Sequence, residues 1–404
     1  MLPFIALSLQ AAYASHFGPS DLKNPNLLFP ESSVARWYDA GLAAHSHVII
    51  WNGAEQRPDY RRFAMTEDSN VFSGPAARAT TPAGFGPSDV RAAYNIPSLS
   101  GTKAIAIVDA YHYATALNDF NVFAKMYGLP LETSTNATLA TNTHFQVVYQ
   151  GTTAPSVNSG WNMEAALDIE WVHAIAPNAK IYLVEANSSS LNDMYAATKK
   201  AATLANVKEV SMSWGAGEYS GETSADSTFS ATGVVFFASS GDTTAVQEYP
   251  SESPNVVAVG GTSLVMSNGA VTKETPWSGA GGGISKYEAI PSYQKSIASY
   301  VGTKRGAADV CAIADPNTGV AVYDSTTVSG RSGWMVVGGT SLACPVTAAI
   351  TNVSGSFLGS SPLELAKIYG GLGGANFRKI SGPTPKATWY YAVGVGSPLG
   401  TKGL

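Results

Sequence analysis

Charged side chains are scarce in this chain: Asp, Glu, Lys and Arg make up 13% of its 404 residues. The 24 basic residues are outnumbered by 29 acidic ones, so the net charge is −5 and no basic stripe could hold the phosphates of a nucleic acid. No apolar run reaches the roughly 20 residues that a bilayer-spanning helix needs. We therefore expect neither nucleic acid nor a membrane as a partner.

Cysteine is almost absent. Cys311 and Cys344 are the only two, which excludes a disulfide-stapled scaffold and a zinc site built from cysteines. A single disulfide between them and a pair of buried free thiols remain open alternatives.

The N-terminal 80 residues have little regular pattern. An apolar run over residues 2–9 and the small-x-small triplet Ala12-Tyr13-Ala14 predict a signal peptide over 1–14, although a basic start is missing. Residues 15–80 are interpreted as a leader or reduced pro-region, with one strand within Leu42–Trp51. His45 and His47 alternate on one face of that strand, and without a third ligand we interpret both as surface residues.

From residue 81 onward, continuous apolar runs alternate with helical patterns. Continuous apolar runs are typical of buried parallel strands, and their alternation with helices predicts a doubly wound, mostly parallel α/β sheet flanked by helices, with ligands at the carboxyl ends of the strands. The strands are expected at 103–109, 180–184, 209–213, 234–238 and 256–259, and the helices at 87–94, 118–127, 162–173 and 191–205.

Ser341 follows Gly338-Gly339-Thr340 and precedes an apolar, alanine-rich run that predicts a buried helix. A hydroxyl at a helix N-terminus lies where unpaired amides favour developing negative charge. Ser341 is therefore either a nucleophile or a simple N-cap, which is the commoner use of such a serine. The nucleophile interpretation requires a base elsewhere in the chain.

Two carboxylates lie four residues apart on the helix predicted at 162–173. At that spacing Glu164 and Asp168 share one helix face. A solvated acidic face would explain the pair, but its apolar neighbours indicate partial burial. Partly buried carboxyls tend to share a proton, which makes one of them a candidate general base.

Asp242 ends the stretch Ala238-Ser239-Ser240-Gly241-Asp242, in which an apolar strand leaves the sheet through small residues. It is either a turn residue or a member of a site at the strand end.

A Ser-His-Asp site of the subtilisin type needs a His-Gly-Thr motif, and none of the six histidines is followed by glycine. His173, near Asp168, is interpreted as an ordinary helix residue. The base must then be a carboxylate.

Several motifs together resemble the sedolisins, the serine-carboxyl peptidases, over about residues 81–400. They are the Glu-x-x-x-Asp helix that continues as Asp168-Ile169-Glu170-Trp171, the stretches 174–181, 213–215, 240–242, 281–285, 291–294 and 314–319, and Gly339-Thr340-Ser341.

The resemblance implies a subtilisin-like fold and a monomeric, secreted peptidase that acts on polypeptides in acid. Ser341 would be the nucleophile, Glu164 the base and Asp168 its orienting partner. Asp242 would stabilise the oxyanion, which requires its protonated form. Asp109 and Trp214 would extend the carboxyl network, and the substrate would lie between two walls formed by Ser213, Trp214, Gly215, Ser239, Ser240 and Gly241.

The sequence departs from the family in three places. Gly338 stands where members have serine. Glycine allows the backbone more conformations, so we do not expect this change to inactivate the site. Lys379 and Tyr390 stand where members bind calcium through carboxylates, so we predict that this site is lost and that no cofactor is needed. One hypothesis is that the Lys379 ammonium replaces the charge of the ion. The segment before residue 81 is also shorter than a full pro-domain.

The sequence thus predicts a secreted, acid-active serine-carboxyl endopeptidase. The alternatives are a tripeptidyl peptidase on the same site and a catalytically silent relative that binds peptides, which the missing calcium ligands and the short leader would suit.

Overall fold

The computed structural model describes residues 27–34, 41–49, 82–97, 101–328, 330–382 and 389–404. The predicted signal peptide and most of the predicted leader lie outside the described residues.

An eight-stranded sheet forms the centre of the molecule, with the strand order β12-β11-β9-β7-β4-β6-β5 and β15 also paired to β11. All its pairings are parallel except the β11–β12 hairpin. The predicted doubly wound, mostly parallel sheet is therefore confirmed. Its strands are β4 (Ala104–Ala110), β5 (Phe145–Tyr149), β6 (Ile181–Ala186), β7 (Val207–Met212), β9 (Val235–Ser239), β11 (Val257–Ser267), β12 (Ala270–Pro276) and β15 (Val310–Ile313).

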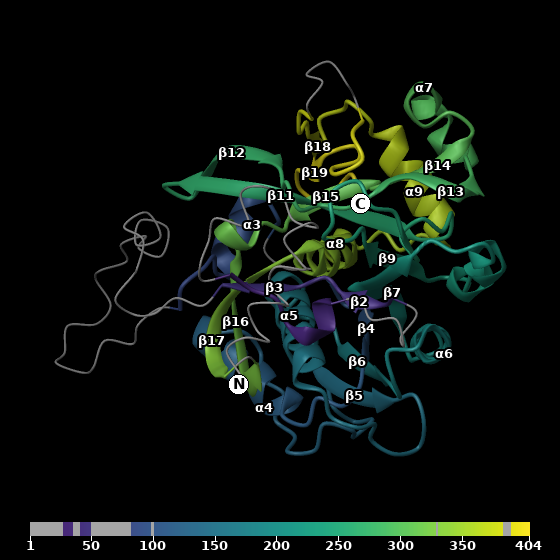
Figure 1. Cartoon of the computed structure of the whole chain (residues 1–404). Helices are drawn as coiled ribbons and strands as arrows, with labels where there is room; N and C mark the ends of the chain where they lie inside the picture. The colour runs from purple at the N-terminus through teal and green to yellow at the C-terminus, as the bar shows by residue number, and fades with distance from the viewer. Residues whose placement is uncertain (1–26, 35–40, 50–81, 98–100, 329, 383–388) are drawn as a thin grey trace, which may run out of the picture.

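The two faces of the sheet carry separate hydrophobic clusters, because successive side chains of a strand point to opposite faces. In β4, Ile105 and Ile107 pack into the cluster that contains α5 (Ser159–Ile175) and α8 (Thr340–Ser354). Ala106 and Val108 pack on the other face against α6 (Leu191–Ala201). Figure 1 shows α5 and α8 running through the middle of the molecule.

Two smaller sheets include parts of the predicted leader. One has the order β10-β8-β2, from Glu248–Tyr249, Trp214–Gly217 and Ala43–Ala44. The other has the order β1-β3-β17-β16, from Leu27–Leu28, His47–Ile49, Arg331–Gly338 and Val320–Val328. The strand predicted within 42–51 is thus two short strands, separated by His45 and Ser46, and the end of the predicted stretch lies outside the described residues.

The remaining elements lie around this core. They are α3 (Pro87–Ala93), α4 (Ala116–Tyr127), α7 (Ala298–Val301), α9 (Ser361–Gly370), β13 (Gly283–Ala289), β14 (Lys304–Ala307), β18 (Phe377–Arg378) and β19 (Ser397–Pro398), with short 3-10 turns at Glu31–Ser33, Glu222–Phe229, Ser292–Ile297 and Pro316–Thr318.

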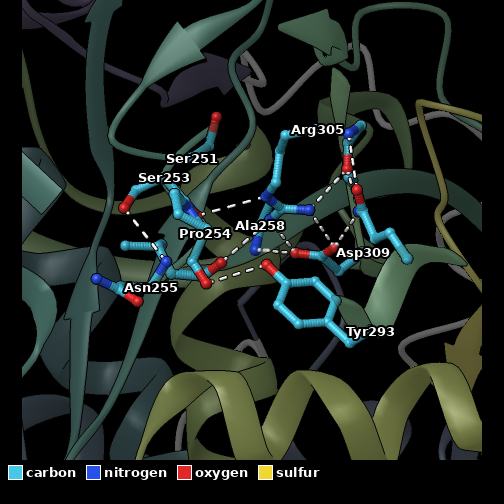
Figure 2. A network of polar contacts seen from close by, with 12 residues as sticks. Ser251, Ser253, Pro254, Asn255, Ala258, Tyr293, Arg305 and Asp309 are labelled. Atoms are coloured by element: carbon cyan, nitrogen blue, oxygen red, sulfur yellow. Dashed lines mark hydrogen bonds and ion pairs between the residues drawn. The ribbon is translucent and has the colours of Figure 1, made fainter. Parts of the chain in front are cut away.

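A buried ion pair ties several of these elements together (Figure 2). Arg305 in β14 donates to both carboxylate oxygens of Asp309, at 2.7 and 2.6 Å, and neither side chain is exposed. Asp309 also accepts from the Ala258 amide of β11 at 2.8 Å and from the Tyr369 hydroxyl of α9 at 2.8 Å. Because every oxygen is satisfied, the pair is compatible with full burial.

Candidate active site

Ser341 is the second residue of α8 and is fully buried. Gly339 is the N-cap, so the interpretation of Ser341 as a simple N-cap is wrong. Gly339 has φ = 115°, a region that favours glycine. A methyl group at Gly338 would lie 2.5 Å from the Pro316 nitrogen and would overlap the Ala314 carbonyl oxygen, which explains why glycine stands where serine is usual.

The carbonyl of Ser341 is released from the helix by Pro345, which lies four residues further on inside α8 and has no N–H to donate back. The Ser213 hydroxyl donates to this carbonyl at 3.2 Å. The same hydroxyl lies 2.9 Å from Asp168 Oδ1. Ser213 therefore links α8 to the carboxyl pair of α5.

Glu164 and Asp168 point toward this junction and are completely buried. Asn158 begins α5 by accepting from the amides of Gly160 and Trp161 at 3.0 and 3.2 Å. Every residue from 160 to 175 of the helix is buried, so the interpretation as a solvated acidic face is wrong.

Burial raises the pKa values of the carboxyl groups in this cluster. The pKa of Glu164 is raised to about 7 by burial, while the hydroxyls of Ser341 and Ser46 and the charge of His45 lower it. Burial and the neighbouring carboxyl groups raise the pKa values of Asp168 and Asp109 well above their usual range. Within the described part of the chain the Glu164 oxygens have no hydrogen-bond partner, and Ser341 Oγ donates to the Ser213 carbonyl oxygen at 3.2 Å.

Asp242 lies beside Ser341, just after β9. Its Oδ1 accepts from the amide and the hydroxyl of Thr340 at 2.8 and 2.7 Å, which fixes the carboxyl group. Burial raises the pKa of Asp242 to about 7, although His45 and Thr340 lower it. Asp242 is therefore held against Thr340, at the N-terminus of the helix that carries Ser341.

Asp109, near the end of β4, interacts with the carboxyl cluster through its charge. Its side chain is buried, and among the residues that the structure describes neither carboxylate oxygen has a hydrogen-bond partner. The Trp214 indole donates to the Val108 carbonyl at 3.0 Å. Trp214 therefore supports the strand next to Asp109 without bonding the carboxyl group itself.

The stretch Ala43–Ser46 of the predicted leader runs through this site. In β2, Ala43 and Ala44 pair antiparallel with Gly215 and Trp214 of β8. The His45 amide lies 3.2 Å from the Ser213 carbonyl oxygen and 2.9 Å from Ser341 Oγ. The His45 carbonyl accepts from the Ser341 amide at 3.0 Å.

The interpretation of His45 as a surface residue is wrong, since only 3% of it is exposed. The reason is that β2 pairs with β8, which places the histidine that follows it among buried residues. The side chain of His47 is not described.

The walls predicted to flank a substrate are largely brought together around His45. Its Nδ1 lies 2.6 Å from Ser239 Oγ and its Nε2 lies 2.6 Å from Glu248 Oε2. A methyl group on Gly215 would lie 3.0 Å from the His45 ring, and one on Gly241 would lie 3.0 Å from the Glu248 carboxyl carbon. Ser240 is an exception, because its hydroxyl donates to the Gly281 carbonyl at 3.3 Å.

Sequence reasoning did not find four residues that shape the site: His45, Ser46, Glu248 and Thr340. Thr340 stood next to the predicted nucleophile, so its hydroxyl was a usable signal for a partner of Asp242. Glu248 had no such signal, because its contact arises only when β10 and β2 pair with opposite edges of β8.

Both cysteines are free and buried, which resolves the alternative left open by the sequence. Among the described residues, no three or more His, Cys, Asp or Glu side chains gather where they could hold a metal ion. Lys379 is exposed, so its ammonium does not occupy a buried ion position. Within the described ranges, no helix has both the length and the apolar character to cross a bilayer.

Comparison with known proteins shows which family the chain belongs to. The Subtilase family model matches residues 146–358. The chain is 30% identical over 373 residues to kumamolisin of Bacillus sp. (strain MN-32), covering 84% of this chain and 61% of that protein. It is 26% identical over 304 residues to sedolisin of Pseudomonas sp. (strain 101), covering 66% of this chain and 50% of that protein. It therefore spans between half and about three fifths of the length of these relatives.

A solved structure agrees with the fold. The structure of Pseudomonas sedolisin, a serine-carboxyl proteinase complexed with two molecules of pseudo-iodotyrostatin, superposes with a TM-score of 0.65 at 24% identity, covering 79% of this chain and 96% of that one. The sheet is thus the subtilisin-like one that the sequence predicts. The chain belongs to the subtilase family and, within it, to the sedolisins.

Proposed function

We propose that the chain is a secreted, acid-active serine-carboxyl endopeptidase that hydrolyses peptide bonds in proteins. One observation supports this above the others: a peptide segment lies across Ser341 as a substrate would. The His45 carbonyl accepts from the Ser341 amide at 3.0 Å, in the position where an oxyanion would form. This segment pairs with β8 before His45 and with β17 after Ser46. The peptide is therefore extended across the site.

In the proposed reaction, Ser341 Oγ attacks the carbonyl carbon of the substrate and transfers its proton to Glu164. The oxyanion that forms accepts hydrogen bonds from the Ser341 amide and from the protonated Asp242 carboxyl group. Glu164 then returns the proton to the leaving amine as the C–N bond breaks. Water attacks the resulting acyl ester by the same route and regenerates the Ser341 hydroxyl.

The pH range of activity depends on the charge that each carboxyl group must carry. Asp242 donates to the oxyanion only while it is neutral, which its pKa of about 7 allows below neutral pH. Glu164 must be ionised to accept the serine proton. Burial raises its pKa to about 7, while the Ser341 and Ser46 hydroxyls and the charge of His45 lower it.

The test is hydrolysis of a denatured protein between pH 3 and 7 by the full chain and its variants. We expect Ser341→Ala and Glu164→Gln each to lower kcat by about a thousandfold or more, because nucleophile and base act as one unit. Ser354→Ala is the matched control: it changes a serine at the other end of α8, whose hydroxyl donates to the Thr351 carbonyl at 2.7 Å. This control should keep full activity.

Activity that survives in both Ser341→Ala and Glu164→Gln would contradict the proposal. Binding of peptides by the wild type without any cleavage would instead support a silent relative. The size of the released products separates an endopeptidase from a tripeptidyl peptidase.

A further inference from the structure

An ion pair between His112 and Glu185 lies beside the buried carboxyl groups of the candidate site. His112 Nδ1 is 2.7 Å from Glu185 Oε2, and the Tyr113 amide donates to Glu185 Oε1 at 3.0 Å. Both oxygens of this buried carboxylate are therefore satisfied. A contact as short as that to Nδ1 is typical of a charge-assisted hydrogen bond, in which the histidine is protonated and the glutamate is ionised.

The backbone that follows β4 holds this histidine in place. Tyr111 has φ = 68°, a left-handed conformation that is uncommon for a residue other than glycine. Its amide donates to the Ala186 carbonyl at 2.9 Å, and the His112 amide donates to the Ser156 carbonyl at 2.8 Å. The turn thus carries His112 from the end of β4 to the end of the neighbouring strand β6, where Glu185 lies.

Glu185 is also the neighbour of Asp109 in the main sheet. β4 and β6 are parallel, and Asp109 pairs with Glu185 in their register. Residues in register on adjacent strands point to the same face of a sheet, which here is the face that packs on α5. The carboxyl groups therefore form a row that runs from Glu164 of α5 through Asp109 to Glu185, and His112 stands at its end.

Asp109 and Glu185 differ in how their oxygens are satisfied. Glu185 has a cation and an amide as partners, whereas the oxygens of the buried Asp109 have none among the described residues. A buried carboxylate without a partner is much less stable than a paired one, so the negative charge belongs to Glu185 and the proton to Asp109. Burial, and then the charges of Glu164 and Glu185, raise the pKa of Asp109, which agrees with this assignment.

The other polar groups near His112 do not replace Glu185 as its partner. The ring of Tyr149 meets the imidazole edge-on, with the ring centroids 5.6 Å apart. The Lys200 ammonium of α6 donates to two backbone carbonyls at the end of β5, and Asp193 accepts from a side-chain amide there at 3.0 Å. The hydrogen bond to Glu185 raises the pKa of His112 against the effect of burial, so the imidazole stays protonated throughout the acid range.

Resting on the peptidase function proposed above, we propose that His112 is a positioning residue: by holding the negative charge on Glu185 it keeps Asp109 neutral, which leaves Glu164 free to ionise and act as the base. Without the cation at position 112, the proton moves to Glu185 and the negative charge to Asp109. Asp109 interacts through its charge with both carboxyl groups of α5. A negative charge on Asp109 therefore opposes the ionisation of Glu164.

The experiment measures the pH profile of kcat/KM for one peptide from pH 3 to 9 with the full chain. His112→Gln keeps an amide that can donate to Glu185 but removes the charge, and His112→Lys restores a cation. His144→Gln is the matched control, because it makes the same change at a histidine just before β5, at the opposite end of that strand. Ser341→Ala is the blank.

We expect the acid limb of the profile to lie about one pH unit higher in His112→Gln than in the wild type, because a buried negative charge moves closer to Glu164. The alkaline limb should not move. His112→Lys should recover most of the shift, and His144→Gln should keep the wild-type profile. A merely structural role of His112 would lower activity at every pH without moving either limb.

A second measurement tests the ion pair without turnover. In the inactive Ser341→Ala protein, the histidine NMR signal that His112→Gln removes should titrate above neutral pH. Adding Glu185→Gln should bring its midpoint back toward about 6.5, the ordinary histidine value.

Three results would overturn the proposal: an acid limb that coincides in the wild type and His112→Gln, a shift as large in His112→Lys as in His112→Gln, or a histidine titration that does not respond to Glu185→Gln. If the wild type cleaves no peptide and matches Ser341→Ala, the peptidase function itself fails and the role of His112 falls with it. Cleavage with an unmoved acid limb refutes only the role of His112.

Discussion

At the scale of single residues, the carboxyl groups of the candidate site lie in different surroundings. Glu164 faces two hydroxyls and the charge of His45, which lower its pKa against the effect of burial. Asp168 faces Asp109 and Glu164, and burial with these two neighbours holds its pKa well above its usual range. Neighbouring groups with divergent pKa values are how acid and base roles are divided in one site.

Asp242 is expected to set the alkaline limit of activity. The burial that raises its pKa to about 7 keeps it neutral below that pH, so the oxyanion donor is lost as pH rises through about 7. Asparagine cannot ionise, and its carbonyl can still accept from Thr340, as Oδ1 does at 2.8 and 2.7 Å. We expect wild-type kcat/KM to fall about tenfold per pH unit above 7, whereas Asp242→Asn should stay nearly flat up to about pH 8.

The measurement is the pH profile of kcat/KM for one peptide from pH 3 to 9. The acid limb should coincide in the two proteins, because it belongs to the Glu164 cluster. If both proteins lose activity at the same alkaline pH, another group sets that limit.

The sequence alone indicates the residues whose roles depend on local patterns. Ser341 stands at a loop-to-helix junction, Glu164 and Asp168 stand four apart among apolar residues, and Asp242 follows an apolar strand. His45 and Glu248 could not be found in this way, because about 200 residues separate them and no local pattern records their contact. Their meeting requires two-residue strands, which are too short to give a periodic signal.

At the scale of elements, the sequence predicts the apolar strands of the main sheet and the long helices that pack on it. The residues at which these elements begin and end are predicted less well. The helix predicted at 162–173 extends over Ser159–Ile175, because Asn158 caps it. The strand predicted within 42–51 is interrupted because its first part pairs with β8 and its second part pairs with β17. Sequence alternation does not encode a change of partner within one strand.

The Arg305–Asp309 pair is expected to govern the stability of the elements it joins (Figure 2). Arg305→Met would leave the Asp309 carboxylate buried without its cation, at a cost of about 3–5 kcal/mol. Asp309 would keep its contacts with the Ala258 amide and the Tyr369 hydroxyl, which limits the loss. Urea unfolding measures the change.

The control is the double variant Arg305→Met with Asp309→Leu, in which no buried charge remains. It should recover part of the stability lost in the single variant, because well-packed apolar residues often replace a buried ion pair without loss. A single variant within about 0.5 kcal/mol of the wild type would contradict the expectation.

At the scale of the whole molecule, the described part of the predicted leader connects the two small sheets. It adds β2 to one small sheet and β1 and β3 to another. The Ser33 hydroxyl donates to the Ser46 carbonyl at 2.6 Å, so the leader also braces itself where it passes Ser341. A segment held by strands on both sides of Ser341 has little freedom to change its register.

The C-terminal segment is held to the body of the molecule by contacts with residues that are distant in the sequence. Arg378 pairs with the buried Glu274 of β12 and donates to the Ala93 carbonyl of α3 at 2.8 Å. The Ser397 hydroxyl donates to the same Glu274 carboxylate at 2.8 Å. Arg378, rather than the exposed Lys379, is thus the cation that ties this segment to the body of the molecule.

Stability is therefore expected to depend on Arg378 and not on calcium. Lys379 and Tyr390 supply no carboxylate, and calcium binding requires a cage of oxygen ligands that normally includes several. We expect the same melting temperature in excess calcium and in excess chelator, measured by calorimetry. Arg378→Met should lower the melting temperature, because leaving Glu274 unpaired costs about 1–3 kcal/mol, while Lys379→Met, a matched change at an exposed position, should not. Melting that falls in chelator and recovers with calcium would show that a calcium site exists after all.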